Sequence, residues 1–428
     1  MKEQINVALL GLGTVGTGVY KILQMQKEDM IPKLGCTVQV KKILVRNIEK
    51  AAKKVEDPSV LTNDWNSIVN DPDIDIVVEV MGGLNPAGTY IREALQAGKN
   101  VVTANKDLIA AEGHELLQIA GELKKDLMFE AAVAGGIPLI RPLKQCLQGN
   151  HIETVMGIVN GTTNFILTKM TFEGMEFGEA LALAQELGYA EADPTADIEG
   201  LDAARKVAIM SSLAFHTKVT FDDVYTEGIT KITAKDIRYA KEMGCRIKLL
   251  GVAKDTPEGV EAAVYPMLVP EQHPLASVND SFNAVFVHGD AVDDAMFYGR
   301  GAGELPTGSA IVGDIFDVVR NINWDCTGRI GCTCYKNLAI KDAKEVSNKY
   351  YIRLKCEDRF GVLAAVTSIF GCHKVSIEQM IQKRKTENTA ELVVVTEAVK
   401  DKHMRASLEA ISHLEVITEI ASVIRVAE

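Results

Sequence analysis

An acidic stretch in the middle of the chain holds two residues whose types and spacing are suited to catalysis. Asp202 and Lys206 are four residues apart, so they share one face if the segment is a helix. Residues 207–210 are apolar, which predicts that the following turn is buried. An isolated pair of this kind is most often a surface ion pair, whereas a buried Asp–Lys pair is costly and indicates a function. We therefore take the pair as a candidate site.

A glycine-rich segment near the start of the chain predicts a dinucleotide site. It follows a strand-like apolar run, residues 5–10, and precedes residues 19–23, which have helical periodicity. Its first glycine permits a tight turn, the second lets the backbone approach a pyrophosphate, and the third allows close helix–strand packing. A plain turn is the alternative interpretation. The predicted cofactor contacts here are Gly11, Gly13, Thr14, Val15 and Gly16.

The residue after the second predicted strand, residues 38–45, bears on the choice of cofactor. An acidic residue at this point binds the ribose 2′-hydroxyl of NAD, but this chain has Arg46. An arginine pairs with a 2′-phosphate. We therefore expect NADP, with NAD possible; the alternative is that Arg46 is an ordinary surface residue.

The elements that must position these residues fall into three predicted domains. Strands alternate with helices near the N-terminus, which indicates a parallel sheet of the Rossmann type. A mixed α+β domain for the substrate and for dimerisation follows, and then a C-terminal βαββαβ, ferredoxin-like unit. The predicted boundaries are 1–134 with 300–330 returning to it, 135–299, a linker at 331–349, and 350–428.

Several motifs together resemble the homoserine dehydrogenase family over residues 5–336. They are the glycine motif and residues 79–83, 103–106, 160–164 and 184–206. The resemblance implies reversible reduction of L-aspartate 4-semialdehyde to L-homoserine with a nicotinamide cofactor, in threonine, methionine and isoleucine biosynthesis. It also favours a homodimer or a homotetramer.

The resemblance assigns roles residue by residue. Lys206 takes the leading part in proton transfer, beside Asp202 and Lys106, because hydride delivered to an aldehyde leaves an alkoxide that needs a proton and a positive charge. Glu191 and Asp197 hold the substrate's α-ammonium. The other implied contacts are Asn160, Gly161 and Thr162 for the substrate, and Thr103, Lys106 and Gly303 for the cofactor.

The family also has a monovalent cation site, which the resemblance places directly after the sheet. Its side-chain ligand corresponds to Glu130, and its carbonyl ligands correspond to Val133, Gly135 and Ile137. Hard oxygen ligands of this kind suit sodium. A charge at the end of a strand is the alternative role for Glu130.

The C-terminal unit resembles an ACT domain, through residues 358–363 and 375–377. Such domains bind small amino acids, so the resemblance implies feedback regulation by L-threonine at a glycine-containing loop. Residues 371–374 depart from the usual pattern, which leaves the effector open. The alternative is a module that only dimerises.

Composition excludes some partners. The net charge of −12 argues against binding to nucleic acid or anionic lipid, and no apolar run approaches the roughly 20 residues of a membrane span. The eight cysteines are scattered, as in a cytoplasmic protein with reduced thiols. Cys332 and Cys334 have neither a second pair nor a histidine near them in sequence, so we predict no zinc site there.

Two other functions remain open at this stage. One is a semialdehyde dehydrogenase with a cysteine nucleophile, for which Cys146 and His151 are the candidates, although neither lies in a recognisable motif. The other is an amino-acid-sensing protein without catalysis. The intact set of Asp202, Lys206 and Lys106 argues against it.

Overall fold

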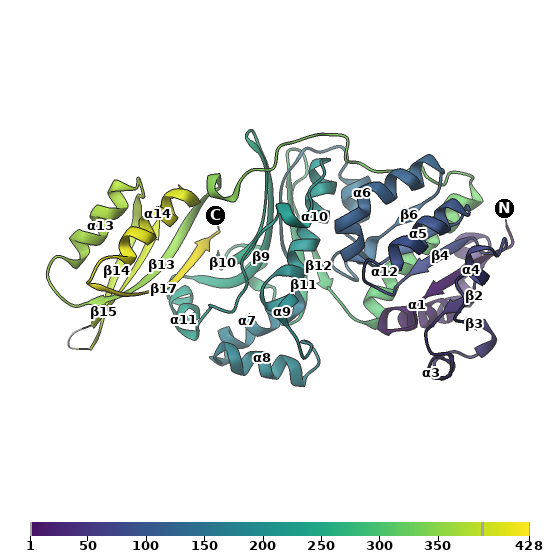
Figure 1. The fold of residues 1–428 in the computed structure, drawn as a ribbon, viewed down its shortest axis with the longest axis horizontal. Coiled ribbons are helices and arrows are strands. Elements are labelled where there is room, and N and C mark those ends of the chain that lie inside the picture. Colours follow the sequence, from purple (N-terminus) through teal and green to yellow (C-terminus); the bar gives the residue numbers. More distant parts are fainter. Residues whose placement is uncertain (1, 387–388, 428) are drawn as a thin grey trace. The chain divides into compact units, whose positions relative to one another are not determined.

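The structure is a computed structural model that describes residues 2–386 and 389–427 (Figure 1). It divides into two compact units. The first unit comprises Met1–Val155, Arg205–Asp223 and Phe282–Leu338, and the second comprises Met156–Ala204, Val224–Ser281 and Ala339–Glu428. The C-terminal module therefore groups with part of the chain's middle, and the three predicted domain boundaries stay a prediction.

The first unit is built on a six-stranded parallel sheet, which confirms the predicted Rossmann-type fold. The strand order is β3-β2-β1-β4-β5-β6, and every neighbouring pair is parallel. The strands are β1 (Gln4–Leu10), β2 (Thr37–Leu44), β3 (Leu61–Thr62), β4 (Ile76–Glu79), β5 (Asn100–Thr103) and β6 (Leu127–Met128). The helices between them are α1 (Thr14–Met25), α2 (Met30–Leu34), α3 (Ile48–Ala52), α4 (Asn66–Val69), α5 (Ala87–Gln96) and α6 (Lys106–Glu122).

The strand order reverses between β1 and β4, which lie side by side. In sheets of this kind, the crevice at the carboxyl ends of such strands is where nucleotides bind. The glycine motif follows β1, and residues 81–83 follow β4. Both loops therefore lie at the predicted cofactor position.

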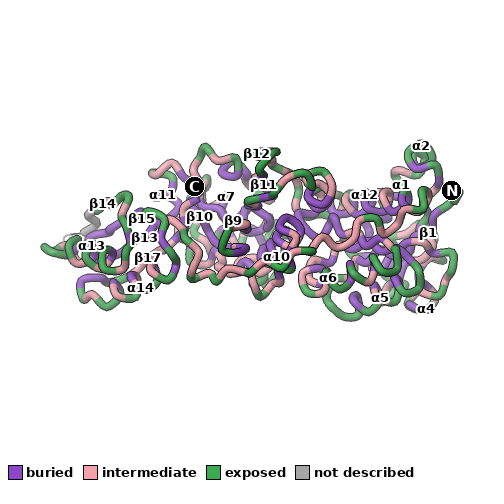
Figure 2. Tube along the Cα trace, turned by 90° about the horizontal axis from the view of Figure 1, so that it is seen from above, coloured by how far each residue is buried: buried purple, intermediate pink, exposed green. Residues whose placement is uncertain are grey.

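Helix α12 (Glu304–Asn323) packs against α1 although it comes much later in the chain. A Cβ atom at Gly18 would lie 2.0 Å from the Glu304 carbonyl oxygen, and one at Gly308 would lie 2.8 Å from the Gly18 carbonyl carbon. Apolar side chains of α12, among them Ile311 and Ile315, are buried in the same core as β1. Helices α1 and α12 lie on one side of the sheet, and α5 and α6 lie on the other (Figure 2).

The first unit also holds the hairpin of β11 (Phe282–Gly289) and β12 (Asp293–Arg300). The sequence predicts no strand at β12. Every residue of β12 is exposed or half-buried, which explains the lack of a buried-strand signal. The pairing with β11 is what defines β12.

Two elements pass from one unit into the other. They are β7 (Ile152–Ile158) and α10 (Leu201–Phe215). The helices of the second unit's middle part are α7 (Gly161–Glu173), α8 (Phe177–Glu186), α9 (Thr195–Ile198) and α11 (Ala234–Glu242). Its strands are β8 (Tyr225–Thr226), β9 (Cys245–Thr256) and β10 (Gly259–Pro270).

The C-terminal module has the predicted βαββαβ order. Its elements are β13 (Ser347–Glu357), α13 (Val362–Cys372), β14 (Ile377–Thr386), β15 (Thr389–Thr396), β16 (Val399–Lys400), α14 (Asp401–Ser412) and β17 (Ile417–Val426). Its four long strands lie in the order β17-β13-β15-β14. Strand β17 also pairs in parallel with β10, so this sheet continues into the middle of the second unit. The structure starts β13 at Ser347, inside the predicted linker.

We find no membrane-spanning candidate: within residues 2–386 and 389–427, every helix is too short or too polar for that role.

Candidate active site

The glycine motif has the geometry that its predicted role requires. Gly11 has a φ of +106°, and a Cβ at Gly16 would lie 2.2 Å from the Gly11 carbonyl oxygen, so both positions require glycine. Gly13 is exposed, and a Cβ there would meet nothing within 4 Å, which leaves room for a ligand. Helix α1 starts at Thr14, and no side chain caps its first N–H groups. These groups are placed to bind a pyrophosphate.

A buried carboxylate organises the neighbouring loop. Glu79, at the end of β4, accepts hydrogen bonds from the backbone N–H groups of Met81 (2.8 Å) and Gly82 (3.1 Å). The Thr103 hydroxyl donates to the same carboxylate (2.7 Å). The fully buried Thr103 hydroxyl is therefore already bonded within the protein. Its predicted cofactor role would be indirect, because it fixes the conformation of the loop after β4. Glu79 has no predicted role of its own, and its only signal in the sequence is an acidic residue that ends a buried strand.

Basic residues lie near the predicted 2′-phosphate position. Arg46 is exposed, two residues after β2, and Lys50 is exposed in α3. Lys54 donates to the Leu12 carbonyl oxygen in the glycine motif (3.0 Å). Lys54 has no predicted role, because only the fold brings it to this loop.

The two predicted catalytic lysines belong to helix turns that are joined by an ion pair in the first unit. Lys106 begins α6, and Lys206 lies in α10 with an exposed fraction of 9%. Asp107 and Arg205, the neighbours of these lysines in sequence, pair at 2.8 Å. Asn105 caps α6 through the N–H of Leu108 and also donates to the Gly83 carbonyl oxygen (2.7 Å). The ion pair and the cap fix the backbone of both turns.

In the second unit, the Asn160 side chain bonds to two of the predicted acidic site residues, Asp197 and Asp202. Its amide nitrogen donates to Asp197 (2.7 Å) and to Asp202 (2.9 Å). Its amide oxygen accepts the backbone N–H of Thr163 (2.9 Å) and thereby caps α7. Since Asp202 and Lys206 lie on the same helix, one turn apart, this group fixes the first turn of α10.

The remaining predicted substrate contacts flank this group. Gly161 is the first residue of α7, and the Thr162 hydroxyl donates to the Tyr189 carbonyl oxygen (2.7 Å). Glu191 is exposed, and Gln185 donates to its carbonyl oxygen (3.1 Å). The predicted role of the Glu191 carboxylate therefore rests on the resemblance alone.

The predicted cation ligands lie in a tight segment after β6. The buried Glu130 carboxylate accepts the backbone N–H groups of Leu139 (2.5 Å), Ile140 (2.7 Å) and Arg141 (2.8 Å). Asp314 lies beside it, and burial together with the Glu130 charge raises the pKa of Asp314 to about 7. Asp314 is already paired with Arg141 (2.8 Å), so the Glu130 carboxylate is the side-chain oxygen ligand that suits a hard cation here. Because Glu130 already accepts three hydrogen bonds, the carbonyls of Val133, Gly135 and Ile137 would supply most of the ligands.

The C-terminal module has a pocket of about 390 Å³ at the start of α13. It is lined by residues 358–363 together with Cys356, Gln382 and Leu392. Gly361 has a φ of +88° and caps α13 without a side chain. The predicted effector loop is thus beside a cavity.

Gly303 directly precedes α12, as Gly361 directly precedes α13, and it has a φ of +125°.

Together, the glycine motif at the sheet's switch point, the paired lysine turns and the effector-type module define a nicotinamide-dependent oxidoreductase with a regulatory domain. Comparison with known families agrees. Family models match for "Homoserine dehydrogenase" (residues 138–316), for "Homoserine dehydrogenase, NAD binding domain" (11–130) and for "ACT domain" (350–414). The chain belongs to the homoserine dehydrogenase family and is an enzyme.

Relatives of similar length support the assignment. Homoserine dehydrogenase from Bacillus subtilis is 43% identical to this chain, and the alignment covers 99% of this chain and 98% of that protein. The Synechocystis enzyme is 46% identical and covers 99% of each. The crystal structure of a homoserine dehydrogenase from Thiobacillus denitrificans is 42% identical, has a TM-score of 0.95, and covers 99% of this chain and 98% of that one. A hyperthermophilic archaeal homoserine dehydrogenase in complex with NADPH is 26% identical, has a TM-score of 0.64, and covers 74% of this chain and 97% of that one.

Proposed function

We propose that this chain interconverts L-aspartate 4-semialdehyde and L-homoserine, as a step of threonine, methionine and isoleucine biosynthesis. The proposal depends mainly on the arrangement of two side chains in the first half of α10. This segment presents Asp202 and Lys206 one turn apart, both buried, with Asp202 bonded to Asn160.

A bound nicotinamide supplies or accepts the hydride at the substrate carbon. Lys206 then stabilises the negative charge that develops on the aldehyde oxygen and donates the proton that completes the alcohol. Asp202 orients this ammonium from the preceding turn, and Lys106 adds a second positive charge from the start of α6. In the reverse direction, the same groups take the proton from the hydroxyl.

Substrate orientation falls to the Asn160 group. Its bonds to Asp197 and Asp202 hold both carboxylates at the start of α10. Asp197, with Glu191, binds the substrate's α-ammonium, while Gly161 and Thr162 line the cleft at the start of α7. Replacing Asn160 by Asp would add a third carboxylate, so we expect a larger loss of activity than with Asn160→Ala.

For the cofactor, we propose NADP, with NAD as a weaker alternative. Arg46 is exposed beyond β2 and suits a 2′-phosphate. The archaeal relative solved with NADPH supports this choice. Gly11, Gly13, Thr14, Val15 and Gly16 bind the pyrophosphate, with Thr103, Lys106 and Gly303 at the cleft. The variant Arg46→Ala should raise the KM for NADP at least tenfold and change that for NAD little.

For the other predicted ligands, we propose a sodium ion held by Glu130, Val133, Gly135 and Ile137, and L-threonine at the loop before α13. The pocket beside Gly361 and the helix N-terminus suit an amino-acid carboxylate. We further propose a cytoplasmic homodimer or homotetramer with the three domains predicted above.

The test is homoserine oxidation followed at the nicotinamide absorbance, with NADP and then NAD, in the presence and absence of threonine. We expect turnover that prefers NADP and is reduced by threonine. Acyl phosphate formation that depends on inorganic phosphate would instead indicate the cysteine mechanism. Threonine binding without any turnover would indicate a sensor protein.

A further inference from the structure

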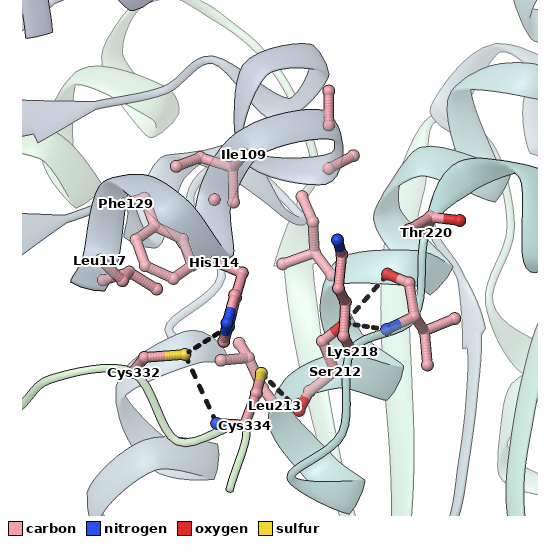
Figure 3. A pocket seen from close by; sticks show the side chains of 15 residues that line it. Ile109, His114, Leu117, Phe129, Ser212, Leu213, Lys218, Thr220, Cys332 and Cys334 are labelled. Carbon is pink, nitrogen blue, oxygen red and sulfur yellow. Dashed lines mark hydrogen bonds between the residues drawn. The ribbon is translucent and has the colours of Figure 1, made fainter. Parts of the chain in front are cut away.

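Two cysteines without a role in the proposed chemistry lie beside a histidine in the first unit. His114 comes from α6, and Cys332 and Cys334 lie in the segment after α12. The His114 Nδ1 is 3.2 Å from the Cys332 Sγ, and the backbone N–H of Cys334 donates to the same sulfur (3.5 Å). Figure 3 shows the imidazole directed at the Cys332 sulfur, with Cys334 on the same side. The three side chains therefore converge.

The distances suit a single metal ion. The ligand atoms of His114, Cys332 and Cys334 all lie within 4.8 Å of one another. A zinc ion with Zn–S bonds of about 2.3 Å and a Zn–N bond of about 2.0 Å places tetrahedral ligands roughly 3.5–3.8 Å apart. Small side-chain rotations are enough to reach this arrangement. We propose that His114, Cys332 and Cys334 form a zinc site.

The surroundings supply a fourth position. A pocket of about 50 Å³ adjoins the three ligands, and a water needs about 10–15 Å³ of such space. Apolar residues of α6 and α10 line it, among them Ile109, Leu117 and Leu213 (Figure 3). Three protein ligands with one position left for water make this an open site.

The site would connect two separate segments, because His114 lies in α6 and both cysteines follow α12. The Cys334 thiol donates to the Ser212 carbonyl oxygen in α10 (3.6 Å), and this bond gives way to the metal when the sulfur binds zinc as a thiolate. The buried Lys144 donates to the Gly331 carbonyl oxygen (3.0 Å) and so holds the backbone directly before Cys332. A bound zinc ion would therefore anchor the chain after α12 to α6, the helix that begins with Lys106. Metal binding should raise the unfolding temperature of the full-length protein.

The first experiment measures metal binding directly. Full-length protein is reduced, stripped with a chelator and titrated with Zn²⁺, and separately with Co²⁺ as a spectroscopic probe. We expect one tight equivalent of zinc and a thiolate-to-cobalt charge-transfer band. Cys332→Ser, Cys334→Ser and His114→Ala should each lower zinc affinity at least tenfold, whereas Cys372→Ser, at an exposed cysteine of α13, should not.

The second experiment needs no variant. Zinc should slow alkylation of Cys332 and Cys334 in the wild-type chain, mapped by mass spectrometry, and leave the exposed Cys146 and Cys372 unchanged. The proposal is overturned if reduced protein takes up no equivalent of zinc, or if protection falls on other cysteines. It is also overturned if the pair forms a disulfide and zinc uptake is the same with the pair oxidised. None of these readouts depends on turnover.

Discussion

At the scale of single residues, the lysine on α10 has lost most of its hydration, since Lys206 is only 9% exposed. A charged group in such a place stabilises a developing negative charge strongly, because no water has to reorganise around it. Asp202, one turn earlier, is held by Asn160 and cannot move freely. The proposed chemistry therefore depends on the lysine's charge more than on its shape.

We expect Lys206→Met to lower kcat by about 10²–10⁴-fold, with a much smaller change in KM, because the charge is needed mainly in the transition state. Steady-state kinetics of homoserine oxidation measure both constants. Lys27→Met, at an exposed lysine after α1, is the control. An unchanged kcat would remove Lys206 from the mechanism.

A second lysine gives a prediction on pH. Burial lowers the pKa of Lys248, on β9, to about 7, and its ammonium donates to the Val278 carbonyl oxygen (2.5 Å) and to the side-chain oxygens of Asn164 and Asn279 (3.2 Å each). An unfolded lysine has a pKa of about 10.4. Between these values the unfolded chain holds the proton that the folded chain has released, so the free energy of unfolding should rise with pH.

The measurement is chemical denaturation of wild type and Lys248→Met at several values between pH 7 and 9. The difference between the two proteins should grow with pH, toward a limiting slope of about 1.4 kcal/mol per pH unit. Lys254→Met, at a half-buried position on the same strand, should show no such slope relative to wild type. A difference that is flat across the range would contradict the prediction.

At the scale of elements, the contact between α1 and α12 depends on two glycines. A Cβ at Gly18 would lie 2.0 Å from a backbone oxygen of α12, and backbone atoms cannot move aside as a flexible side chain can. Both helices contribute to the core under the cofactor sheet. The close approach of α1 and α12 at this crossing thus attaches α12 to the first unit.

Gly18→Ala should lower the free energy of unfolding by about 1–3 kcal/mol, because the added methyl group forces the helices apart. Gly313→Ala is the matched control on α12, since its Cβ would have no neighbour closer than 3.9 Å. That variant should be neutral or stabilise by up to about 1 kcal/mol through helix propensity. Equal destabilisation by both substitutions would show that the crossing is not responsible.

At the scale of the whole molecule, a buried ion-pair network ties the C-terminal module to the middle of the second unit. Arg353 on β13 pairs with Asp236 on α11 (2.9 Å), and the same guanidinium reaches Glu391 on β15 (3.5 Å). Lys235 and Tyr239, both on α11, also bind Glu391. Any change in the module's sheet therefore acts on α11.

Arg353→Met should lower the free energy of unfolding by about 3–5 kcal/mol, because it leaves the buried Asp236 carboxylate without its charge partner, whereas Glu391 keeps Lys235. Lys383 pairs with Glu242 of α11 at a more exposed position of the same sheet. Lys383→Met should therefore lower the free energy of unfolding by less than about 1 kcal/mol. Thermal and chemical denaturation compare the two variants. Similar losses for both would show that burial does not decide the strength of this link.

Much of the fold could be predicted because its signals are local. The glycine motif, the alternation of strands and helices, and the βαββαβ order of the last 79 residues all appear within short windows of sequence. Hydrophobic periodicity and turn residues determine such elements before any long-range contact forms. Asp202 and Lys206 were predictable in the same way, because four residues on one helix share a face.

The tertiary structure decided what joins residues that are far apart in the chain. Strand β12 exists through its pairing with β11, β17 extends the sheet of β10, and Asp107 meets Arg205 only because α6 and α10 converge. His114 reaches Cys332 across more than 200 residues, which is why spacing alone predicted no metal there. The physical reason is the same in each case: a contact between distant segments depends on how elements pack, and packing leaves no periodic trace in either segment's own sequence.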